Sequence, residues 1–346
     1  MNVGTLESTA KQMVAPGRGI LAADESTGTI TKRFDAVSIE SNEDNRRAYR
    51  EMLFGTEGIG QYLSGVIMFD ETIRQSSSDG RPFAKVLQDQ GVIPGIKVDG
   101  GAKDMALSPG EKVTEGLDGL RERLSEYVDM GARFTKWRAV ITINEQKAIP
   151  TQRCIDANAH ALARYAALVQ EAGMVPIVEP EVLIDGTHSI DSCYEATENT
   201  LNHTFHELYH QGVDVRGVIL KPNMVLSGKD ASDRADVQTV ARYTLECLMK
   251  TVPAALPGIA FLSGGQSDRE ATAHLDAMNR LASEMGPLPW EITFSYARAL
   301  QDLPMRTWKG EASNVGEAQR IFAHRAKMNS LAHAGEYSES MEESAA

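Results

Sequence analysis

The feature that most constrains the fold is a regular alternation of short apolar runs with longer segments of helical periodicity. The apolar runs are bounded by turn residues and are short enough to be strands. There are eight of them: GILAAD (19–24), GVIMFD (65–70), IPGIKVD (93–99), RFTKWRAVI (133–141), VPIVEPEVL (175–183), GVILKP (217–222), IAFLSGG (259–265) and ITFSYAR (292–298). Repeated strand–helix units of this kind imply a parallel sheet.

Helical periods lie between these strands, at residues 42–54, 116–131, 151–173, 196–211, 236–251 and 268–286. Eight strand–helix units predict an α/β fold of the (β/α)8 TIM-barrel type, whose core takes about 250 residues. The chain has 346 residues and no Gly/Ser-rich or Pro-rich linker. We therefore expect a single TIM-barrel domain over residues 1–335, with N-terminal and C-terminal additions. Residues 336–346 are polar and acidic, and we expect a flexible C-terminal tail there.

The charge of the chain argues against two classes of partner. The formal net charge is −13 at pH 7, and acids and bases are interspersed through most of the sequence. Nucleic acids and anionic membranes require a basic surface, so we expect neither as a partner. The N-terminal stretch has no apolar export signal, and no window approaches the roughly 18 apolar residues of a membrane span. We expect a cytoplasmic protein.

The cysteines point to the same compartment. Cys154, Cys193 and Cys247 are odd in number, far apart and outside any C-x-x-C spacing. We interpret them as reduced thiols that pack in the interior of a cytosolic protein.

Polar residues gather at the C-terminal ends of the predicted strands. They are Asp24, Lys97, Asp99, Lys136, Arg138, Glu179, Glu181, Lys221, Ser263 and Arg298. In a TIM barrel these ends converge on one mouth, where the active site is built. Side chains two residues apart on a strand share a face, so Lys136 with Arg138, and Glu179 with Glu181, can point into the lumen together. Solvated strand ends account for one or two such residues, but not for charges on most of the strands.

The segment GVILKPNM (217–224) places Lys221 where a buried strand should finish. Desolvation and neighbouring cations both lower the pKa of such an ammonium group. A lysine with an accessible neutral fraction attacks a carbonyl carbon and forms a Schiff base, whose protonated nitrogen accepts electrons from a neighbouring C–C bond. Loss of the carbinolamine hydroxyl as water needs an acid/base group, and Glu179 is the candidate. This chemistry uses no metal.

Two stretches after the last two strands indicate a phosphate site. FLSGGQS (261–267) places Ser263 and a glycine pair before a helical segment that opens with Ser267. Glycines let backbone N–H groups approach an anion, and the loops after strands seven and eight are the recurrent phosphate site of this fold. SYARAL (295–300) adds Arg298, whose guanidinium can bind phosphate oxygens in pairs.

A second anion site is one interpretation of ESTGTITKR (25–33), which follows the first strand. Its hydroxyl groups and its two basic residues suit a phosphate. An equally good interpretation is a helix N-cap followed by a solvated basic turn. Two phosphate sites that flank a Schiff-base lysine would suit a bisphosphorylated ketose.

These residues resemble those of the class I fructose-1,6-bisphosphate aldolases. The matching stretches, in order, are GILAADESTGTITKR, DGRPF, GIKVDGG, KWRAV, VPIVEPEVL, LKPNM, FLSGGQS and SYARAL. The resemblance implies a TIM barrel, usually assembled as a homotetramer, without a cofactor or a catalytic metal. It implies reversible cleavage of fructose 1,6-bisphosphate to dihydroxyacetone phosphate and glyceraldehyde 3-phosphate in glycolysis and gluconeogenesis. The partners would then be phosphorylated ketose and triose substrates.

The resemblance also implies roles for individual residues. Lys221 would be the Schiff-base lysine, Glu179 the acid and base of imine chemistry, and Asp24 the group that handles the C4 hydroxyl proton. The remaining catalytic residues would be Lys136, Arg138 and Glu181. The C1-phosphate cradle maps to Ser263, Gly264, Gly265, Ala297 and Arg298, with Ser295 as a further substrate-binding residue. The other phosphate maps to Ser26, Thr29, Arg33 and Lys97.

Two positions depart from the family pattern. Many members have glycine where this chain has Ala297, and alanine keeps the N–H but not the freedom to adopt positive φ. The animal enzymes use a C-terminal tyrosine in proton transfer at C3 of the enamine. This chain ends in EESAA, and its last aromatic residue is Tyr337, so the enamine proton donor is unassigned.

Two other functions compete with this interpretation. The segment His206-Glu207-Leu208-Tyr209-His210 matches H-E-x-x-H, the zinc-binding pattern of metallopeptidases. It lies in a predicted helix, however, and the helices of a TIM barrel form its outer ring, away from the mouth. The second alternative is a barrel that binds sugar phosphates without turnover, which would keep the phosphate sites but would not need Lys221 or Glu179.

Overall fold

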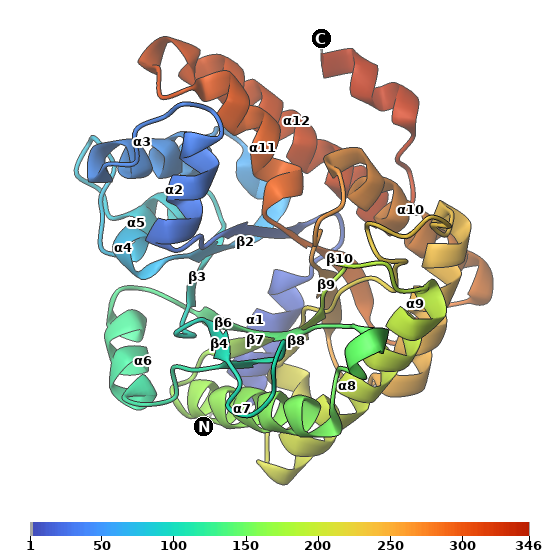
Figure 1. Ribbon diagram of the computed structural model, residues 1–346. Coiled ribbons are helices and arrows are strands. Elements are labelled where there is room, and N and C mark those ends of the chain that lie inside the picture. The colour runs from blue at the N-terminus through green and yellow to red at the C-terminus, as the bar shows by residue number, and fades with distance from the viewer. Residues whose placement is uncertain (1–2, 346) are drawn as a thin grey trace.

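The computed structural model describes residues 3–345, and eight parallel strands form a closed barrel at its centre (Figure 1). Around the barrel the strands follow the order β1, β10, β9, β8, β7, β6, β3, β2. Their bounds are β1 (Gly19–Ala23), β2 (Leu63–Met68), β3 (Ile93–Lys97), β6 (Phe134–Ile141), β7 (Val175–Val182), β8 (Ile219–Leu220), β9 (Gly258–Phe261) and β10 (Glu291–Tyr296). The predicted TIM barrel is confirmed, and each of its strands falls on one of the apolar runs.

Helices surround the barrel and cover its closed end. They are α1 (Val3–Met13), α2 (Thr27–Asp35), α3 (Glu43–Phe54), α4 (Asp70–Ile73), α5 (Phe83–Asp89), α6 (Leu120–Asp129), α7 (Gln152–Glu171), α8 (Ile190–His210), α9 (Val237–Thr251), α10 (Asp268–Met285), α11 (Arg298–Trp308) and α12 (Val315–His333). Within residues 3–345, none of these helices is both long and apolar enough to cross a membrane. A small antiparallel hairpin of β4 (Ala102–Asp104) and β5 (Lys112–Thr114) lies outside the barrel sheet.

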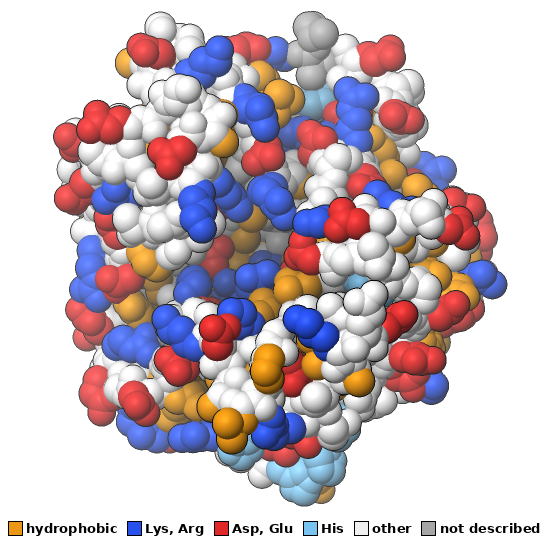
Figure 2. All heavy atoms as spheres, viewed as in Figure 1, with side chains coloured by type: hydrophobic (Ala, Val, Ile, Leu, Met, Phe, Trp, Pro, Cys, Tyr) orange, Lys and Arg blue, Asp and Glu red, His pale blue; other side chains and the backbone are white. Residues whose placement is uncertain are grey.

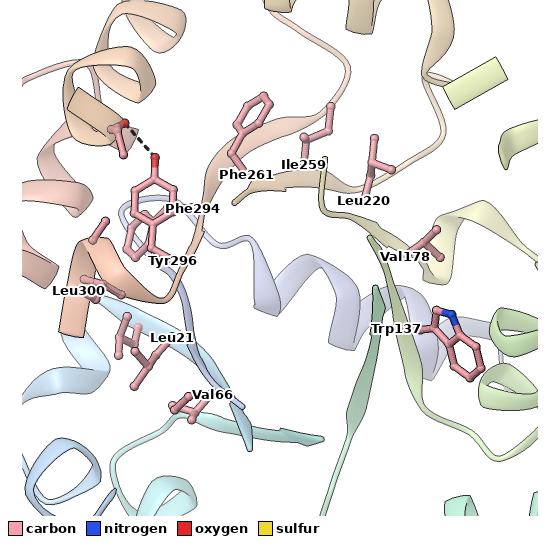
Figure 3. Close-up of a cluster of buried hydrophobic side chains, with 14 of the residues drawn as sticks. Leu21, Val66, Trp137, Val178, Leu220, Ile259, Phe261, Phe294, Tyr296 and Leu300 are labelled. Atoms are coloured by element: carbon pink, nitrogen blue, oxygen red, sulfur yellow. Dashed lines mark hydrogen bonds between the residues drawn. The ribbon is translucent and has the colours of Figure 1, made fainter. Parts of the chain in front are cut away.

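The strands separate two hydrophobic cores because successive side chains point to opposite faces. On β1, Ile20 and Ala22 belong to the cluster inside the barrel, whereas Leu21 and Ala23 belong to the layer between strands and helices. Figure 3 shows part of that outer layer, in which Tyr296 of β10 donates its hydroxyl hydrogen to the carbonyl oxygen of Ala271 at 2.9 Å. The period of two therefore decides which side chains face the lumen.

Helix α1 fills the N-terminal end of the barrel. Its residues Leu6, Ala10 and Met13 recur at helical spacing and join the inner cluster, together with Val14. A Cβ at Gly258, at the start of β9, would lie 2.7 Å from the Val14 side chain, so the strand needs glycine there. With one end closed, the lumen opens only toward the carboxyl ends of the strands.

Phe134 of β6 is the largest side chain of the inner cluster, and the neighbouring strand makes room for it. A Cβ at Gly95 of β3 would lie 2.2 Å from its ring, closer than any real contact. The aromatic ring is completely buried, and the next inward residue of β6 is Lys136, which lies closer to the open end of the barrel. The ring therefore forms part of the floor of the space above.

The C-terminal segment, for which we expect a flexible tail, contacts α12 in the structure. A 3-10 helix, η5 (Glu339–Ala345), follows α12, and Glu342 forms an ion pair with Arg325 of α12, which is only 2% exposed. Glu342 also accepts a hydrogen bond from the Tyr337 hydroxyl at 3.0 Å. A buried guanidinium needs a carboxylate partner, and the tail supplies it. Ala346, the last residue of the predicted tail, lies outside the described residues.

All three cysteines are buried and unbridged, as the sequence predicts. Burial raises the pKa of the Cys154 thiol to about 11 and that of Cys247 to about 12. Burial raises the pKa of Cys193 as well. They therefore pack as neutral thiols, which are poor nucleophiles.

Candidate active site

A cavity of about 930 Å³ opens at the carboxyl ends of the strands. Figure 2 shows this hollow near the centre of the molecule, with lysine and arginine side chains gathered around it. Lining residues come from strands on both sides of the barrel, including Asp24 after β1, Lys136 in β6 and Lys221 after β8. The chain as a whole is acidic, so this basic lining is a local feature.

The pleat of the strands directs these side chains into the cavity. Inside the barrel, Phe134, Ile177 and Ile219 are members of the apolar inner cluster. Two residues further along each strand, the side chains are those of Lys136, Glu179 and Lys221, and all three line the cavity. Beyond these lie Arg138 and Glu181, which also line it. The alternation that builds the inner core therefore presents charged groups above it.

Four of these groups form a continuous series of ion pairs across the floor of the cavity. Lys221 Nζ lies 3.1 Å from Glu179 Oε1, and Glu179 Oε2 lies 3.3 Å from Lys136 Nζ. The same Lys136 Nζ lies 2.6 Å from Asp24 Oδ2. Lys221, Glu179 and Lys136 are each less than 5% exposed. Each carboxylate is held by lysine, and Glu179 is shared between two lysines.

Mutual charge stabilisation sets the protonation of this series. Burial alone would raise the pKa of the Asp24 carboxyl, but the charges of Lys136, Lys221 and Lys97 outweigh it and hold the pKa at about 2. Burial would likewise lower the pKa of Lys136, but Asp24 and Glu179 raise it well above its ordinary value. At neutral pH, Asp24 is therefore a carboxylate and Lys136 is an ammonium ion.

Two further ion pairs hold the rim beside this series. Arg138 Nε of β6 donates a hydrogen bond to Glu181 of the neighbouring strand β7. Burial alone would lower the pKa of the Arg138 guanidinium, but the charge of Glu181 outweighs burial and raises that pKa. Lys97 Nζ lies 2.6 Å from Asp99 Oδ1, and the other oxygen of Asp99 accepts a hydrogen bond from the Arg138 backbone at 3.2 Å. These contacts orient the β3 and β6 side chains relative to each other.

The loops after β9 and β10 form one end of the cavity. Gly264 and Gly265 have φ values of +25° and +81°, a region that favours glycine. The chain then enters α10 through a capping box between Ser267 and Glu270. On the adjacent strand, the Ser295 hydroxyl is buried and has no hydrogen-bond partner among the described residues. An unpaired buried hydroxyl that lines a cavity is available to a ligand.

Ala297 and Arg298 complete this end and begin α11. Ala297 has φ of −103°, so the position does not use the positive φ that glycine would allow. The alanine therefore adds no backbone strain of that kind, and its N–H remains. The loss of access to positive φ, which the sequence comparison raised for alanine at position 297, therefore has no effect on this loop.

The segment after β1 forms the opposite end of the cavity, and it begins helix α2. Ser26 is the N-cap residue of α2, and its hydroxyl lies 3.1 Å from that of Thr29 instead of capping the backbone. Both residues line the cavity, so this helix begins at the cavity wall. Arg33 also lines it, but its guanidinium is bound by the buried Glu25. Part of its hydrogen-bonding capacity is thus already used.

Comparison with known proteins identifies this arrangement. The family model described as fructose-bisphosphate aldolase class-I matches residues 5–346. The chain is 57% identical over 338 residues to a probable fructose-bisphosphate aldolase class 1 of Xanthomonas campestris, covering 97% of this chain and 99% of the relative. It belongs to the class I fructose-bisphosphate aldolase family.

More distant members of the aldolase family agree. A fructose-bisphosphate aldolase of Dictyostelium discoideum is 50% identical over 96% of this chain and 92% of its own. A solved structure of the Plasmodium falciparum aldolase, in complex with TRAP and a small-molecule inhibitor, superposes with a TM-score of 0.95 at 47% identity, covering 97% of this chain and 96% of that one. The chain is therefore a fructose-bisphosphate aldolase, a carbon–carbon lyase, as the sequence predicts.

Nearly all of the residues expected to form the aldolase site line this one cavity. They are Asp24, Ser26, Thr29, Arg33, Lys97, Lys136, Arg138, Glu179, Glu181, Lys221, Ser263, Gly264, Ser295, Ala297 and Arg298. Gly265 does not line it, and serves instead as the second positive-φ residue of the turn.

Sequence reasoning missed three charged residues that line the cavity: Glu25 after β1, and Asp302 and Arg306 on α11. For the α11 residues the signal was present, because Arg298, Asp302 and Arg306 are spaced by four, and side chains at that spacing share a helix face. Using it would have required knowing that a helix begins at Arg298.

Tyr337, the last aromatic residue, does not line the cavity of the aldolase. Its backbone N–H donates to Asp276 of α10 at 2.9 Å, and its hydroxyl donates to Glu342. In this arrangement it belongs to the docked C-terminal segment.

The H-E-x-x-H segment lies at the end of α8, which packs against α7 on the outside of the barrel. Glu207 binds His160 of α7 at 2.7 Å, so this carboxylate is engaged with a histidine outside the motif. Within residues 3–345 no group of three or more histidine, cysteine or acidic side chains is placed to hold a metal ion. Membership of the aldolase family replaces the peptidase alternative.

Proposed function

We propose that this aldolase cleaves fructose 1,6-bisphosphate through a Schiff base on Lys221. The observation that carries the proposal is the buried series Lys221, Glu179, Lys136 and Asp24 at the floor of the cavity. It combines two lysine amines, one carboxylate shared between them and a second carboxylate that is ionised at neutral pH, with neighbouring members of the series at most 3.3 Å apart. A non-catalytic sugar-phosphate binder would have no use for such a costly set of buried charges.

In the first step, the Lys221 amine forms a bond to C2, the carbonyl carbon of the open-chain ketose. Glu179, 3.1 Å from that amine, is positioned to take the ammonium proton beforehand. It then returns a proton to the carbinolamine hydroxyl, which leaves as water. The product is a protonated imine between C2 and Lys221, while Lys136 keeps its charge and stabilises Glu179 when it is ionised.

In the second step, the bond between C3 and C4 breaks. Asp24 is the proposed base for the C4 hydroxyl proton, since its pKa of about 2 keeps it ionised at neutral pH. As that proton leaves, C4 becomes the aldehyde of glyceraldehyde 3-phosphate, and the bonding electrons move to the iminium nitrogen. Lys136, 2.6 Å from Asp24, balances the charge changes at this carboxylate.

In the third step, the remaining enamine takes a proton at C3, and water then adds to C2 and releases dihydroxyacetone phosphate from Lys221. We assign no donor for the C3 proton, since Tyr337 is held in the C-terminal segment. Glu181 bonds Arg138 and is the proposed electrostatic partner of the lysines.

Two ends of the cavity are the proposed phosphate sites. The turn at Ser263 and Gly264, the Ser295 hydroxyl and Arg298 supply donors for the C1 phosphate. Ser26, Thr29, Arg33 and Lys97 supply donors for the other phosphate, from β3 and the start of α2. We further propose a cytosolic enzyme of glycolysis and gluconeogenesis that assembles as a homotetramer. A 48% identical relative from Arabidopsis thaliana is named as cytosolic, and light scattering tests the assembly.

The decisive experiment is reductive trapping. The enzyme is incubated with dihydroxyacetone phosphate and borohydride, and the modified peptide is located by mass spectrometry. We expect the adduct on Lys221, and no adduct and no cleavage in Lys221→Met. The matched control is Lys250→Met, which replaces a lysine on the outer helix α9 that is paired with Glu198, and which should be trapped like the wild type. An adduct on another lysine, or wild-type turnover in Lys221→Met, would overturn the mechanism.

A further inference from the structure

The aldolase reaction does not use the histidine-rich end of α8. His206 and His210 are both exposed and lie one helical turn apart. Their Nε2 atoms are 3.1 Å from each other, and the ring centroids are 4.3 Å apart. Figure 2 shows histidine side chains gathered at the lower edge of the molecule, well away from the hollow.

The distance between these two nitrogen atoms matches the span of a metal chelate. Zinc binds imidazole nitrogen at about 2.0–2.1 Å, so two ligands on one ion lie about 2.9 Å apart at a right angle and about 3.4 Å apart at a tetrahedral angle. The observed 3.1 Å falls between these values. The same spacing suits a hydrogen bond between two neutral rings, and a metal ion would take the place of the shared proton.

The neighbouring histidines are already engaged. His203 bonds Asp156 of α7 at 2.9 Å, and His160 bonds Glu207 at 2.7 Å. These contacts tie α7 to α8 and leave the pair at 206 and 210 as the only histidines of this group whose rings meet each other, among the residues described.

We propose that His206 and His210 form a binding site for one late first-row divalent transition metal ion, with water in the remaining coordination positions. Imidazole suits zinc, nickel and copper, whereas calcium and magnesium require oxygen ligands. The general order of affinities places Cu²⁺ above Ni²⁺ and Zn²⁺. Two protein ligands make this an open, exchangeable site and not a closed structural one. Ligands at positions i and i+4 would brace the last turn of α8 when the ion binds.

The site is separate from the active site. It lies at the C-terminal end of α8, whereas the cavity is lined by residues of β7, the strand that precedes this helix. No cavity-lining residue belongs to α8. Metal binding is therefore expected to leave aldolase turnover unchanged.

The test is calorimetric titration of the untagged full-length enzyme with Zn²⁺ and with Ni²⁺, which avoid the redox chemistry of copper. We expect one ion per chain, bound at least about tenfold more weakly by His206→Gln and by His210→Gln, since losing even an outer partner of a metal ligand costs 10–100-fold. His203→Gln and His160→Gln are the matched controls, and should bind as the wild type does. All four histidines lie on the outer helices α7 and α8 and none is fully buried, so each substitution should cost little stability.

The proposal fails if the wild-type enzyme binds neither ion at millimolar concentration. It also fails if His206→Gln and His210→Gln retain wild-type affinity, which would place the ion elsewhere. Greater weakening in His203→Gln or His160→Gln than in the two proposed ligands would overturn it too.

Discussion

Two consecutive carboxylates after β1 have different ion-pair partners. Asp24 continues the inward series of Ile20 and Ala22, and it is bound by Lys136 at the cavity, where its pKa is about 2. Glu25 continues the outward series of Leu21 and Ala23, and although it also borders the cavity, it is bound by arginine. The alternation of side chains along the strand separates them, so adjacent residues of one type enter two different clusters.

The Glu25 cluster is saturated with arginine and amide donors. One oxygen binds Arg33 and the Gln301 amide, the latter at 3.1 Å, and the other binds Arg50 at 2.6 Å. Gln301 in turn accepts hydrogen bonds from Tyr49 at 3.2 Å and from Arg50 at 3.3 Å. Burial, which alone would raise the pKa of Glu25, is outweighed by Arg50 and Arg33, which lower it. This cluster ties α2, α3 and α11 to β1.

The cavity cluster uses lysine instead. A lysine is a point charge on a flexible stem that can lose its proton, whereas arginine is a fixed fork that stays charged. Glu179 is shared between Lys136 and Lys221, and all four members of the series line the cavity. The comparison teaches that arginine completes a buried ion-pair cluster that stabilises the fold, whereas lysine, which can lose its proton, stands where the proposed chemistry needs an amine.

Replacing Lys221 should have the largest effect and should act on activity alone. For Lys221→Met we expect a loss of turnover of more than about 10⁴-fold, because the covalent route disappears. The free energy of unfolding should change by less than about 1 kcal/mol, since Lys136 still neutralises Glu179 and apolar replacements of buried ions are often tolerated. Steady-state cleavage and urea unfolding measure the two quantities. A large loss of stability would erase the contrast between the clusters.

Replacing Glu25 should have the reverse profile. Glu25→Gln leaves Arg50 buried without its carboxylate, which should lower the free energy of unfolding by about 3–5 kcal/mol. Turnover per folded molecule should stay near the wild-type value, whereas KM should change, because Glu25 binds Arg33 of the proposed phosphate site. The double variant Glu25→Gln/Arg50→Met should recover part of the stability, because the unpaired charge is also removed. Chemical denaturation with activity assays checks this, and a selective loss of turnover would contradict it.

Glu179 tests whether the shared carboxylate moves protons. Glu179→Gln should slow formation of the imine by about 10²–10⁴-fold, the usual contribution of a general acid or base. Binding of dihydroxyacetone phosphate should change little, since the proposed phosphate donors lie elsewhere. Rapid-quench trapping with borohydride measures the imine rate, and equilibrium titration measures binding. An unchanged imine rate would assign the proton transfer to another group.

Replacing Asp24 should have the smallest effect, a change in how the free energy of unfolding depends on pH in acid. Its pKa is about 2 in the folded chain against an ordinary 3.8, so between these pH values the unfolded chain binds more protons. The stability that Asp24 contributes is therefore complete above the ordinary value and is lost as the pH falls toward 2. From pH 5 to pH 2, the wild type should lose about 2 kcal/mol more than Asp24→Asn. Unfolding curves at several pH values measure the difference, and equal slopes would contradict it.

Much of the fold could be predicted from local sequence patterns. The predicted helix at 151–173 corresponds to α7, and the predicted strand at 133–141 corresponds to β6. Both could be predicted because the periodicity of a helix or a strand depends only on residues close together in the chain. The helix α1 was not predicted, because its apolar face has a purpose only when a barrel needs its end closed. The strand predicted at 217–222 is shorter in the structure, since only Ile219–Leu220 forms the ladder, although the Lys221 N–H still donates to the Val178 carbonyl oxygen at 2.8 Å.

The candidate site divides in the same way. Lys221, Glu179 and Lys136 were predictable, because each stands in an apolar run where a charge is unexpected. Arg306 was not, because a charged residue on a helix surface is ordinary until the helix is known to border the cavity. The C-terminal segment was expected to be mobile because acidic composition says nothing about a distant buried arginine.

The amino-acid sequence by itself determined the strand count, the barrel, the acidic chain with basic strand ends, and the lysine suited to carbonyl chemistry, because these depend on period and residue type. Only the tertiary structure decided that Glu179 is shared by two lysines and that Glu342 is bound to Arg325. It also decided that Asp24 pairs with a lysine whereas Glu25 pairs with two arginines. Such pairings join residues far apart in the chain, and burial and charge acquire their energetic meaning only when distance is known.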